Sequence, residues 1–157
     1  MPPQFLFDIS GLDLTHVVCD QEEIRRYNPH RGDMEHLNGI VYLDPALERL
    51  VGYKDIRADE FWVPGHIPGR PLFPGVLMIE AGAQLACFYT RRYCGWKGFV
   101  AFSALDDVKF RGAVVPPCRM ILVGLKIWER HRRINCRMQG LVEGNLCFEA
   151  SITGMEM

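Results

Sequence analysis

Residues 61–92 read FWVPGHIPGRPLFPGVLMIEAGAQLACFYTRR, and the two halves of this stretch have opposite characters. The half up to residue 75 holds four prolines and three glycines. Because proline fixes φ and lacks an amide donor, this half is predicted to be an irregular loop. Residues 76–93 contain no proline and only one glycine, Gly82, so they predict a long helix that Pro74 and Gly75 introduce.

The predicted helix is apolar almost all round between residues 76 and 89, as expected for a helix that the rest of the fold encloses. Only Glu80 and Gln84 interrupt it, and their spacing of four places them on the same face. A carboxylate in such surroundings is costly unless it is paired or protonated. From the helix alone, a structural carboxylate held by Gln84 or by backbone donors is as good an interpretation as a functional one.

The remaining sequence predicts one α+β domain. Its 157 residues are enough for one hydrophobic core and too few for two domains of ordinary size. Asp20 is predicted to cap a short helix, and residues 1–14 are predicted to be irregular. Alternating or β-branched patterns predict strands within residues 34–43, 47–58, 99–104, 107–110, 120–128, 134–142 and 146–153. One buried helix followed by a run of antiparallel strands favours a curved sheet wrapped around that helix.

Composition argues against several classes of protein. A net charge of −1 disfavours a general nucleic-acid binder. The first residues lack the basic segment and apolar run of a signal peptide, and the run at residues 76–89 is too short to span a bilayer. The six cysteines show no metal-ligand spacing, so no metal is expected, and they suit free thiols in the cytoplasm.

Positive charge is concentrated in one region of the chain. Residues 91–137 hold eleven lysines and arginines against three acidic residues. Such a region can attract an acidic partner over a distance. Strands that simply turn their polar faces to solvent explain the same pattern, so both interpretations stay open.

Residues 65–84, GHIPGRPLFPGVLMIEAGAQ, resemble the motif of the β-hydroxyacyl-acyl carrier protein dehydratases, which have the hot-dog fold. The proline-histidine-arginine run at residues 29–31, the VKFR run at residues 108–111 and the Glu-Ala pair at residues 149–150 are similar to further family motifs. The resemblance covers roughly residues 28–153, and residues 1–27 diverge from the family. The interval from His66 to Glu80 is that of the family's catalytic pair.

The resemblance implies a hot-dog domain over residues 1–157, with the curved antiparallel sheet wrapped around the central helix. It also implies a homodimer in which each active site takes His66 from one subunit and Glu80 from the other. Three dimers together occur in the family. The family's substrates are thioesters of acyl carrier protein, with coenzyme A as the alternative carrier, and the reaction needs no cofactor.

The chemistry of dehydration explains why this pair of residues would be used. Removing an α-proton and expelling hydroxide requires a base and an acid at the same substrate carbons. Histidine is a common general base in enzymes, so His66 suits the base. Burial favours the protonated form of a carboxyl group, so Glu80 suits the acid, and the amide of Gly75 at the helix start suits a developing oxyanion. Gln84 is expected either to hold Glu80 or a water, or to pack the helix.

Three other groups of residues receive expected roles from the resemblance. Ile67 and Phe73 stand where the family commonly has phenylalanine and methionine, and with Val76 they are expected to line the substrate tunnel. His30 and Arg31 are expected to serve loop structure. Basic residues expected to dock the acidic carrier are Arg91, Arg92 and Arg132.

The expected reaction is therefore dehydration of a (3R)-hydroxyacyl thioester to the trans-2-enoyl thioester. A hot-dog acyl-thioesterase is an alternative, although the loop histidine argues against it. A non-catalytic acyl-binding or accessory subunit is a third interpretation, which the retained motif residues disfavour.

Overall fold

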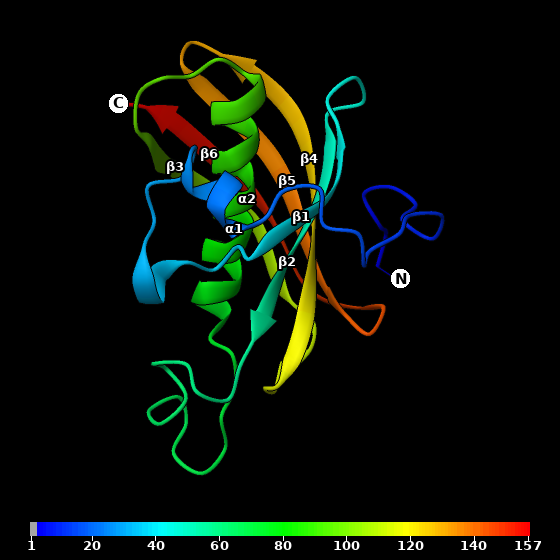
Figure 1. Cartoon of the computed structure of the whole chain (residues 1–157), viewed down its shortest axis with the longest axis vertical. Coiled ribbons are helices and arrows are strands. Elements are labelled where there is room, and N and C mark those ends of the chain that lie inside the picture. The colour runs from blue at the N-terminus through cyan, green and yellow to red at the C-terminus, as the bar shows by residue number, and fades with distance from the viewer. Residues whose placement is uncertain (1–2) are drawn as a thin grey trace.

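The computed structural model describes residues 3–157 and shows a six-stranded antiparallel sheet curved around one long helix (Figure 1). Met1 and Pro2, the start of the predicted irregular lead-in, lie outside the described residues. In chain order the elements are α1 (Gln21–Arg25), the 3-10 helix η1 (Gly32–Met34), β1 (Gly39–Asp44), β2 (Arg49–Ile56), α2 (Gly75–Tyr93), β3 (Val100–Phe110), β4 (Cys118–Arg130), β5 (Arg133–Val142) and β6 (Asn145–Glu156). The predicted α+β class and hot-dog arrangement are confirmed.

The sheet has the strand order β1-β2-β4-β5-β6-β3, and every neighbouring pair is antiparallel. Successive hairpins join β4, β5 and β6, whereas β3 follows α2 and pairs with the far side of β6. This order leaves β1 and β3 at the two edges of the sheet. Residues predicted as two strands at 99–104 and 107–110 form the single strand β3, which two bulges interrupt near Phe102 and Asp107.

Helix α2 lies in the hollow of the sheet, as its apolar sequence predicts (Figure 1). It begins at Gly75, one residue before the predicted range, with Pro74 at the N-cap. Most of its residues from Met78 to Thr90 are buried, whereas Val76 at its first turn is 72% exposed. A Cβ on Gly82 would lie 3.2 Å from Cβ of Met138, so the glycine lets the helix approach β5 closely.

The outer face of the sheet is covered by the segment before α1 (Figure 1). Phe7 packs with buried residues of β1, β2 and β4 in a second apolar cluster. Gln139 fixes the segment, because its Oε1 accepts from the amide of Leu6 and its Nε2 donates to the carbonyl of Gln4. Residues 3–14 are irregular, as predicted, but they close one face of the sheet.

Within the described residues, no helix is both long and apolar enough to cross a membrane.

His36 is fully buried, and neither of its ring nitrogens has a hydrogen-bond partner among the described residues. Burial, followed by the charge of Lys54, lowers the pKa of His36 from 6.5 to about 4. The unfolded chain therefore binds more protons at this position between these two values, and stability must rise with pH there. The nearby charge of Glu60 opposes the shift without reversing it.

We therefore expect the contribution of His36 to the free energy of unfolding to be fully present above pH 6.5. It should be lost as the pH falls towards 4, and the loss should total about 3 kcal/mol. Urea unfolding midpoints at several pH values would measure the loss. In a His36→Leu variant the acid-dependent loss should be smaller, whereas His16→Leu, at an exposed histidine, should behave as wild type. Equal pH slopes for wild type and His36→Leu would contradict the prediction.

Candidate active site

The loop of residues 57–74 projects beyond the sheet at the start of α2 and carries His66 (Figure 1). A buried ion pair anchors its base: Nζ of Lys54 lies 2.7 Å from Oε1 of Glu60, and the two side chains are 3% and 8% exposed. The amide of His66 donates to the carbonyl of Trp62, and the carbonyl of His66 accepts from the amide of Leu72. The prolines and glycines thus fold into a hydrogen-bonded turn that sets the place of His66.

The ring of His66 is held in one orientation. Its Nδ1 lies 2.7 Å from the carbonyl oxygen of Leu72. Because a carbonyl can only accept, we assign the proton of the neutral ring to Nδ1. The other nitrogen, Nε2, then carries the lone pair, which is the form that a general base requires.

His66 lines an open cavity of about 390 Å³ at the N-terminus of α2. The predicted tunnel residues Phe73 and Val76 line the same cavity, but Ile67 does not and is half exposed. Gly75 lies here as well, and its amide has no acceptor among the described residues. A Cβ at position 75 would lie 2.7 Å from the ring of Phe110, so a larger residue there would displace that half-exposed ring.

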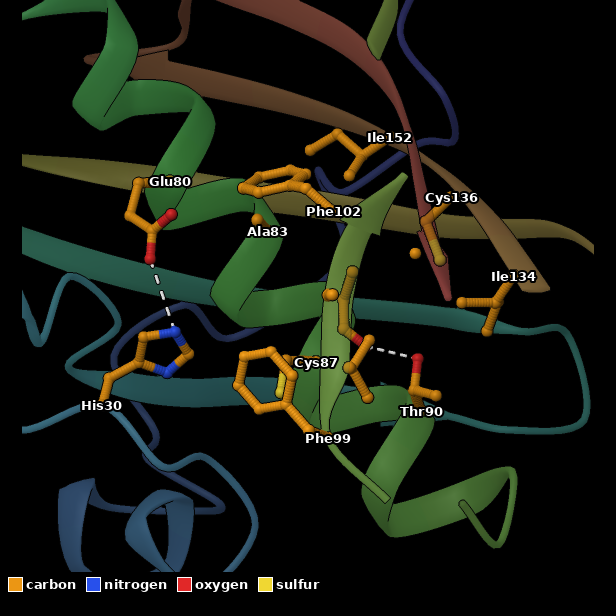
Figure 2. A pocket seen from close by; sticks show the side chains of 14 residues that line it. His30, Glu80, Ala83, Cys87, Thr90, Phe99, Phe102, Ile134, Cys136 and Ile152 are labelled. Atoms are coloured by element: carbon orange, nitrogen blue, oxygen red, sulfur yellow. Dashed lines mark hydrogen bonds and ion pairs between the residues drawn. The ribbon is translucent and has the colours of Figure 1, made fainter. Parts of the chain in front are cut away.

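Glu80 lies one to two turns further along α2 and lines a different cavity, of about 270 Å³ (Figure 2). Gln84 donates from Nε2 to Oε1 of Glu80 at 2.8 Å and to the carbonyl of Met34 at 2.7 Å. Oε1 of Gln84 accepts from the amide of His36 at 2.8 Å. Both roles considered for Gln84 are therefore present, because it holds the carboxylate and ties the helix to the segment before β1.

His30 contacts the same carboxylate, which the sequence did not predict (Figure 2). Its Nε2 lies 3.4 Å from Oε1 of Glu80, and its buried Nδ1 has no partner among the described residues. Burial lowers the pKa of His30 although the charge of Glu80 opposes the shift. We assign the ring proton to Nε2, since a carboxylate can only accept. Arg31 has the expected loop role, because its guanidinium donates to backbone carbonyls of residues 25, 28 and 30.

The walls of the Glu80 cavity are largely apolar and were also missed. On α2 they are small residues of the Glu80 face, namely Ala83, Ala86, Cys87 and Thr90. Strands β3, β5 and β6 and the residue before β3 supply the opposite wall with Phe99, Val100, Ala101, Phe102, Ile134, Cys136, Ile152 and Gly154. The sequence could have indicated the first wall, because these small side chains recur at helical spacing from Glu80. It could not have indicated the second wall, because that wall depends on which strands pair.

Two cysteines line this cavity, and both are held in the thiol form. Burial raises the pKa of Cys87 to about 11 and that of Cys136 to about 12. The thiolate is the nucleophilic form of cysteine, so neither side chain is suited to attack a bound thioester. Within residues 3–157, no group of three or more His, Cys, Asp and Glu side chains is placed to hold a metal ion.

A single chain does not bring His66 and Glu80 together. They line separate cavities, and no hydrogen bond or ion pair joins them among the described residues. One cavity offers a base and a free amide, and the other offers a carboxylate beside an apolar space. Each cavity therefore holds one residue of the predicted acid–base pair.

The structure weakens the prediction of a basic docking surface. Several arginines and lysines of residues 91–137 pair with carboxylates, as in the contacts Arg111–Glu149, Arg119–Asp55, Lys126–Glu48 and Arg137–Glu149. Among the three docking candidates, Arg132 lies 3.4 Å from Glu156 and Arg91 donates to the carbonyls of residues 97 and 98. Arg92 lies over the ring of Tyr93. The folded region therefore carries less unbalanced positive charge than its count of lysines and arginines indicates, because strand pairing places acidic residues beside it.

A curved antiparallel sheet around one long helix is the hot-dog arrangement, and it carries the loop histidine and the helix glutamate of the predicted acid–base pair, each facing a cavity. Residues 28–151 match the model of the FabA-like domain family, and the chain belongs to that family.

Two relatives by sequence are both 3-hydroxyacyl-[acyl-carrier-protein] dehydratases named FabZ. The chain is 33% identical over 139 residues to the 3-hydroxyacyl-[acyl-carrier-protein] dehydratase FabZ of Sinorhizobium medicae, covering 88% of this chain and 90% of that one. It is 32% identical over 127 residues to the FabZ of Desulfotalea psychrophila, covering 79% and 84%. Among solved structures, the dehydratase heterocomplex ApeI:P from Xenorhabdus doucetiae has a TM-score of 0.73 over 85% of this chain and 90% of that one, at 12% identity. The last likeness concerns the fold alone.

Proposed function

We propose that this chain is a hydro-lyase that dehydrates (3R)-hydroxyacyl thioesters of acyl carrier protein to trans-2-enoyl thioesters in acyl-chain synthesis. The observation that carries the proposal is the orientation of His66, whose Nδ1 donates to Leu72 and leaves Nε2 available as a base. The Gly75 amide in the same cavity and the carboxyl group of Glu80 in the other supply the remaining groups that the reaction needs.

The proposed reaction proceeds as an acid–base elimination. Nε2 of His66 takes the α-proton, and the electron pair of the broken C–H bond forms the C2–C3 double bond. Negative charge that develops on the thioester oxygen is stabilised by the amide of Gly75 at the N-terminus of α2. Glu80 gives its proton to the departing hydroxyl group, which leaves as water. Solvent then returns the proton from His66 to Glu80.

We further propose that the working unit is a homodimer joined along β3. This strand is an edge of the sheet, and an unpaired edge of this length is a template for a second chain. Its exposed face carries large apolar residues, with Phe102 at 49%, Leu105 at 44% and Phe110 at 52% exposure. Phe102 lines the Glu80 cavity and Phe110 the His66 cavity, so a partner docked on β3 reaches both half-sites.

An assay for both directions tests the proposed activity. Purified protein is supplied with a 3-hydroxyacyl thioester or with crotonyl thioester, and the conjugated enoyl chromophore is followed. We expect reversible interconversion without release of free thiol. Thiol release would indicate the acyl-thioesterase alternative. The absence of both reactions, with acyl binding retained, would indicate the non-catalytic alternative.

His30 is proposed to position Glu80, because its Nε2 lies 3.4 Å from Oε1 of Glu80, and its removal is expected to lower kcat by about 10- to 100-fold. His30→Ala should leave KM nearly unchanged. His30→Gln, whose amide can donate to Glu80, should recover part of the rate. Steady-state kinetics of the three proteins, with their melting temperatures as the control for folding, measure the effect. Equal kcat for His30→Ala and wild type would contradict the role.

Acyl carrier protein is proposed as the carrier, with coenzyme A as the alternative, and Arg92 as a docking residue. Arg92→Glu is expected to raise KM several-fold for carrier-linked substrate, because it reverses a charge that faces an acidic partner. KM for a short thioester without a carrier protein should not change. Arg57→Glu, at an exposed arginine paired with Asp59, is the control. An unchanged KM for carrier-linked substrate in Arg92→Glu would refute the docking site.

We propose a cytoplasmic location, since the described cysteines are free thiols and suit a reducing compartment. Cell fractionation with an antibody against the chain would test it, and recovery in a membrane or secreted fraction would contradict it.

A further inference from the structure

A second pocket, of about 330 Å³, adjoins the apolar Glu80 cavity at its far end. Cys87, Phe99 and Val100 line both spaces, so the two spaces adjoin at these three residues. The remaining residues of the second pocket differ from the apolar cavity in being mostly basic or polar, and they are Arg25, Arg26, Tyr27, Asn28, Pro29, Arg31 and Arg91. The apolar cavity that contains Glu80 thus ends beside a pocket lined by four arginines.

Two of these arginines carry charge that no carboxylate balances. Arg25 pairs with Glu35, and Arg26 pairs with Glu23. Arg31 and Arg91, in contrast, have no carboxylate within 4.0 Å in residues 3–157. Each of these two is instead held by backbone carbonyl oxygens, which are neutral acceptors.

The contacts of Arg91 leave part of its guanidinium available. Its Nη1 donates to the carbonyls of Lys97 and Gly98. A guanidinium has five N–H donors, so the three donors on Nε and Nη2 have no acceptor among the described residues. Fixed in place and still able to donate, Arg91 has the properties of an anion-binding arginine.

Glu80 and Arg91 are separated by a distance that an acyl chain can span. They lie eleven residues apart on α2, with Ala83, Cys87 and Thr90 between them on the cavity wall. At 1.5 Å per residue this is about 16 Å along the helix. An extended chain advances about 3.5 Å for every three bonds, so about fourteen bonds cover the distance.

We propose that the arginine pocket binds an anionic group at the distal end of the ligand whose apolar part fills the Glu80 cavity. The proposal rests on the proposed function, since the reacting end of that ligand lies at Glu80. A carboxylate at the far end of the acyl chain has this chemistry, and so does the phosphate of a pantetheine carrier arm. The apolar walls of the connecting cavity favour the acyl carboxylate, because a pantetheine arm would bury its amides without partners there.

Matched substrates test the proposal. N-acetylcysteamine thioesters of 3-hydroxyhexadecanoate and of 3-hydroxyhexadecanedioate differ only in the distal carboxylate, and neither contains phosphate. We expect the wild-type protein to have at least a tenfold higher kcat/KM for the dioate than Arg91→Gln has, while their kcat/KM values for the monoacid differ much less. Arg130→Gln, at an arginine that lies over Trp128 and outside the pocket, is the charge control and should keep the wild-type ratio.

A third substrate separates the two sources of the anion. The phosphopantetheine thioester of 3-hydroxyhexadecanoate is compared with its N-acetylcysteamine thioester. If Arg91→Gln lowers kcat/KM only for the dioate, the bound anion is the acyl carboxylate. If it lowers kcat/KM only for the phosphopantetheine thioester, the bound anion is the phosphate. If the ratios of kcat/KM between the three substrates are the same in wild type and in Arg91→Gln, the proposal is overturned. Absence of turnover of every substrate by wild type would instead overturn the proposed function.

Discussion

Replacing His66 by alanine or Glu80 by glutamine is expected to lower kcat for 3-hydroxyacyl dehydration by about 10²- to 10⁴-fold in each case, the usual contribution of a positioned acid or base. His66→Ala removes the imidazole ring that the carbonyl of Leu72 orients. Among the described residues of that cavity, no other side chain can act as a base. Glu80→Gln keeps the shape of the side chain but removes its exchangeable acid proton. Initial rates with a purified substrate measure both effects.

Mixing the two inactive proteins is the sharper form of this experiment. If each site takes His66 from one subunit and Glu80 from the other, a mixed dimer contains one intact site and one site without either group. Random pairing of equal amounts should then restore about a quarter of wild-type activity. Recovery after subunit exchange, compared with each variant alone, measures it. Activity that stays at the level of the single variants, although mass spectrometry shows mixed dimers, would mean that each chain forms its own site.

Breaking the proposed β3 interface is expected to remove nearly all activity without touching either reacting group. Leu105 is 44% exposed on an edge strand, and a dimer joined there would bury it. Leu105→Asp would place an unpaired charge in that interface, which costs several kcal/mol and raises the dissociation constant at least about 100-fold. Sedimentation velocity measures the dimer, and the dehydration assay at the same protein concentrations measures the activity. We expect Leu105→Asp to lose both together.

Leu47→Asp is the matched control, because Leu47 is 53% exposed in the turn between β1 and β2 at the opposite edge of the sheet. It should remain dimeric and active. Far-ultraviolet circular dichroism distinguishes a folded monomer from an unfolded Leu105→Asp protein. A monomeric, folded and fully active Leu105→Asp protein would show that the site does not need a partner. Larger species in the wild-type sedimentation profile would report an assembly of dimers.

Elements that follow local rules were predictable from the chain alone. Prolines and glycines up to residue 75 exclude regular structure, and the helix begins where they end because Pro74 and Gly75 suit its first positions. Gln84 meets Glu80 because residues four apart share a helix face. Asp20 caps α1 by accepting from the amide of Glu23, as its side chain and position predict.

Contacts between distant segments were not predictable in this way. His30 lies fifty residues from Glu80, and only the packing of the segment between α1 and β1 against α2 places it there. Strand register decides which arginines are neutralised, so Arg111 and Arg137 meet Glu149 although the sequence shows them as unopposed charges. The number of basic residues in a segment can be read from the sequence. Whether acidic side chains balance them depends on which residues meet on the folded surface.

The sequence by itself determined the class of fold, the loop and the helix, because backbone restrictions and side-chain periodicity act over a few residues. The resemblance of residues 65–84 to a family motif supplied His66 and Glu80 as the expected reacting pair. Only the tertiary structure decided that His66 and Glu80 line separate cavities, that His30 contacts the carboxyl group of Glu80, and that the apolar Glu80 cavity adjoins a pocket lined by Arg91. Cavities are enclosed by strands and helices far apart in the chain, and their shape depends on long-range packing that no local pattern specifies.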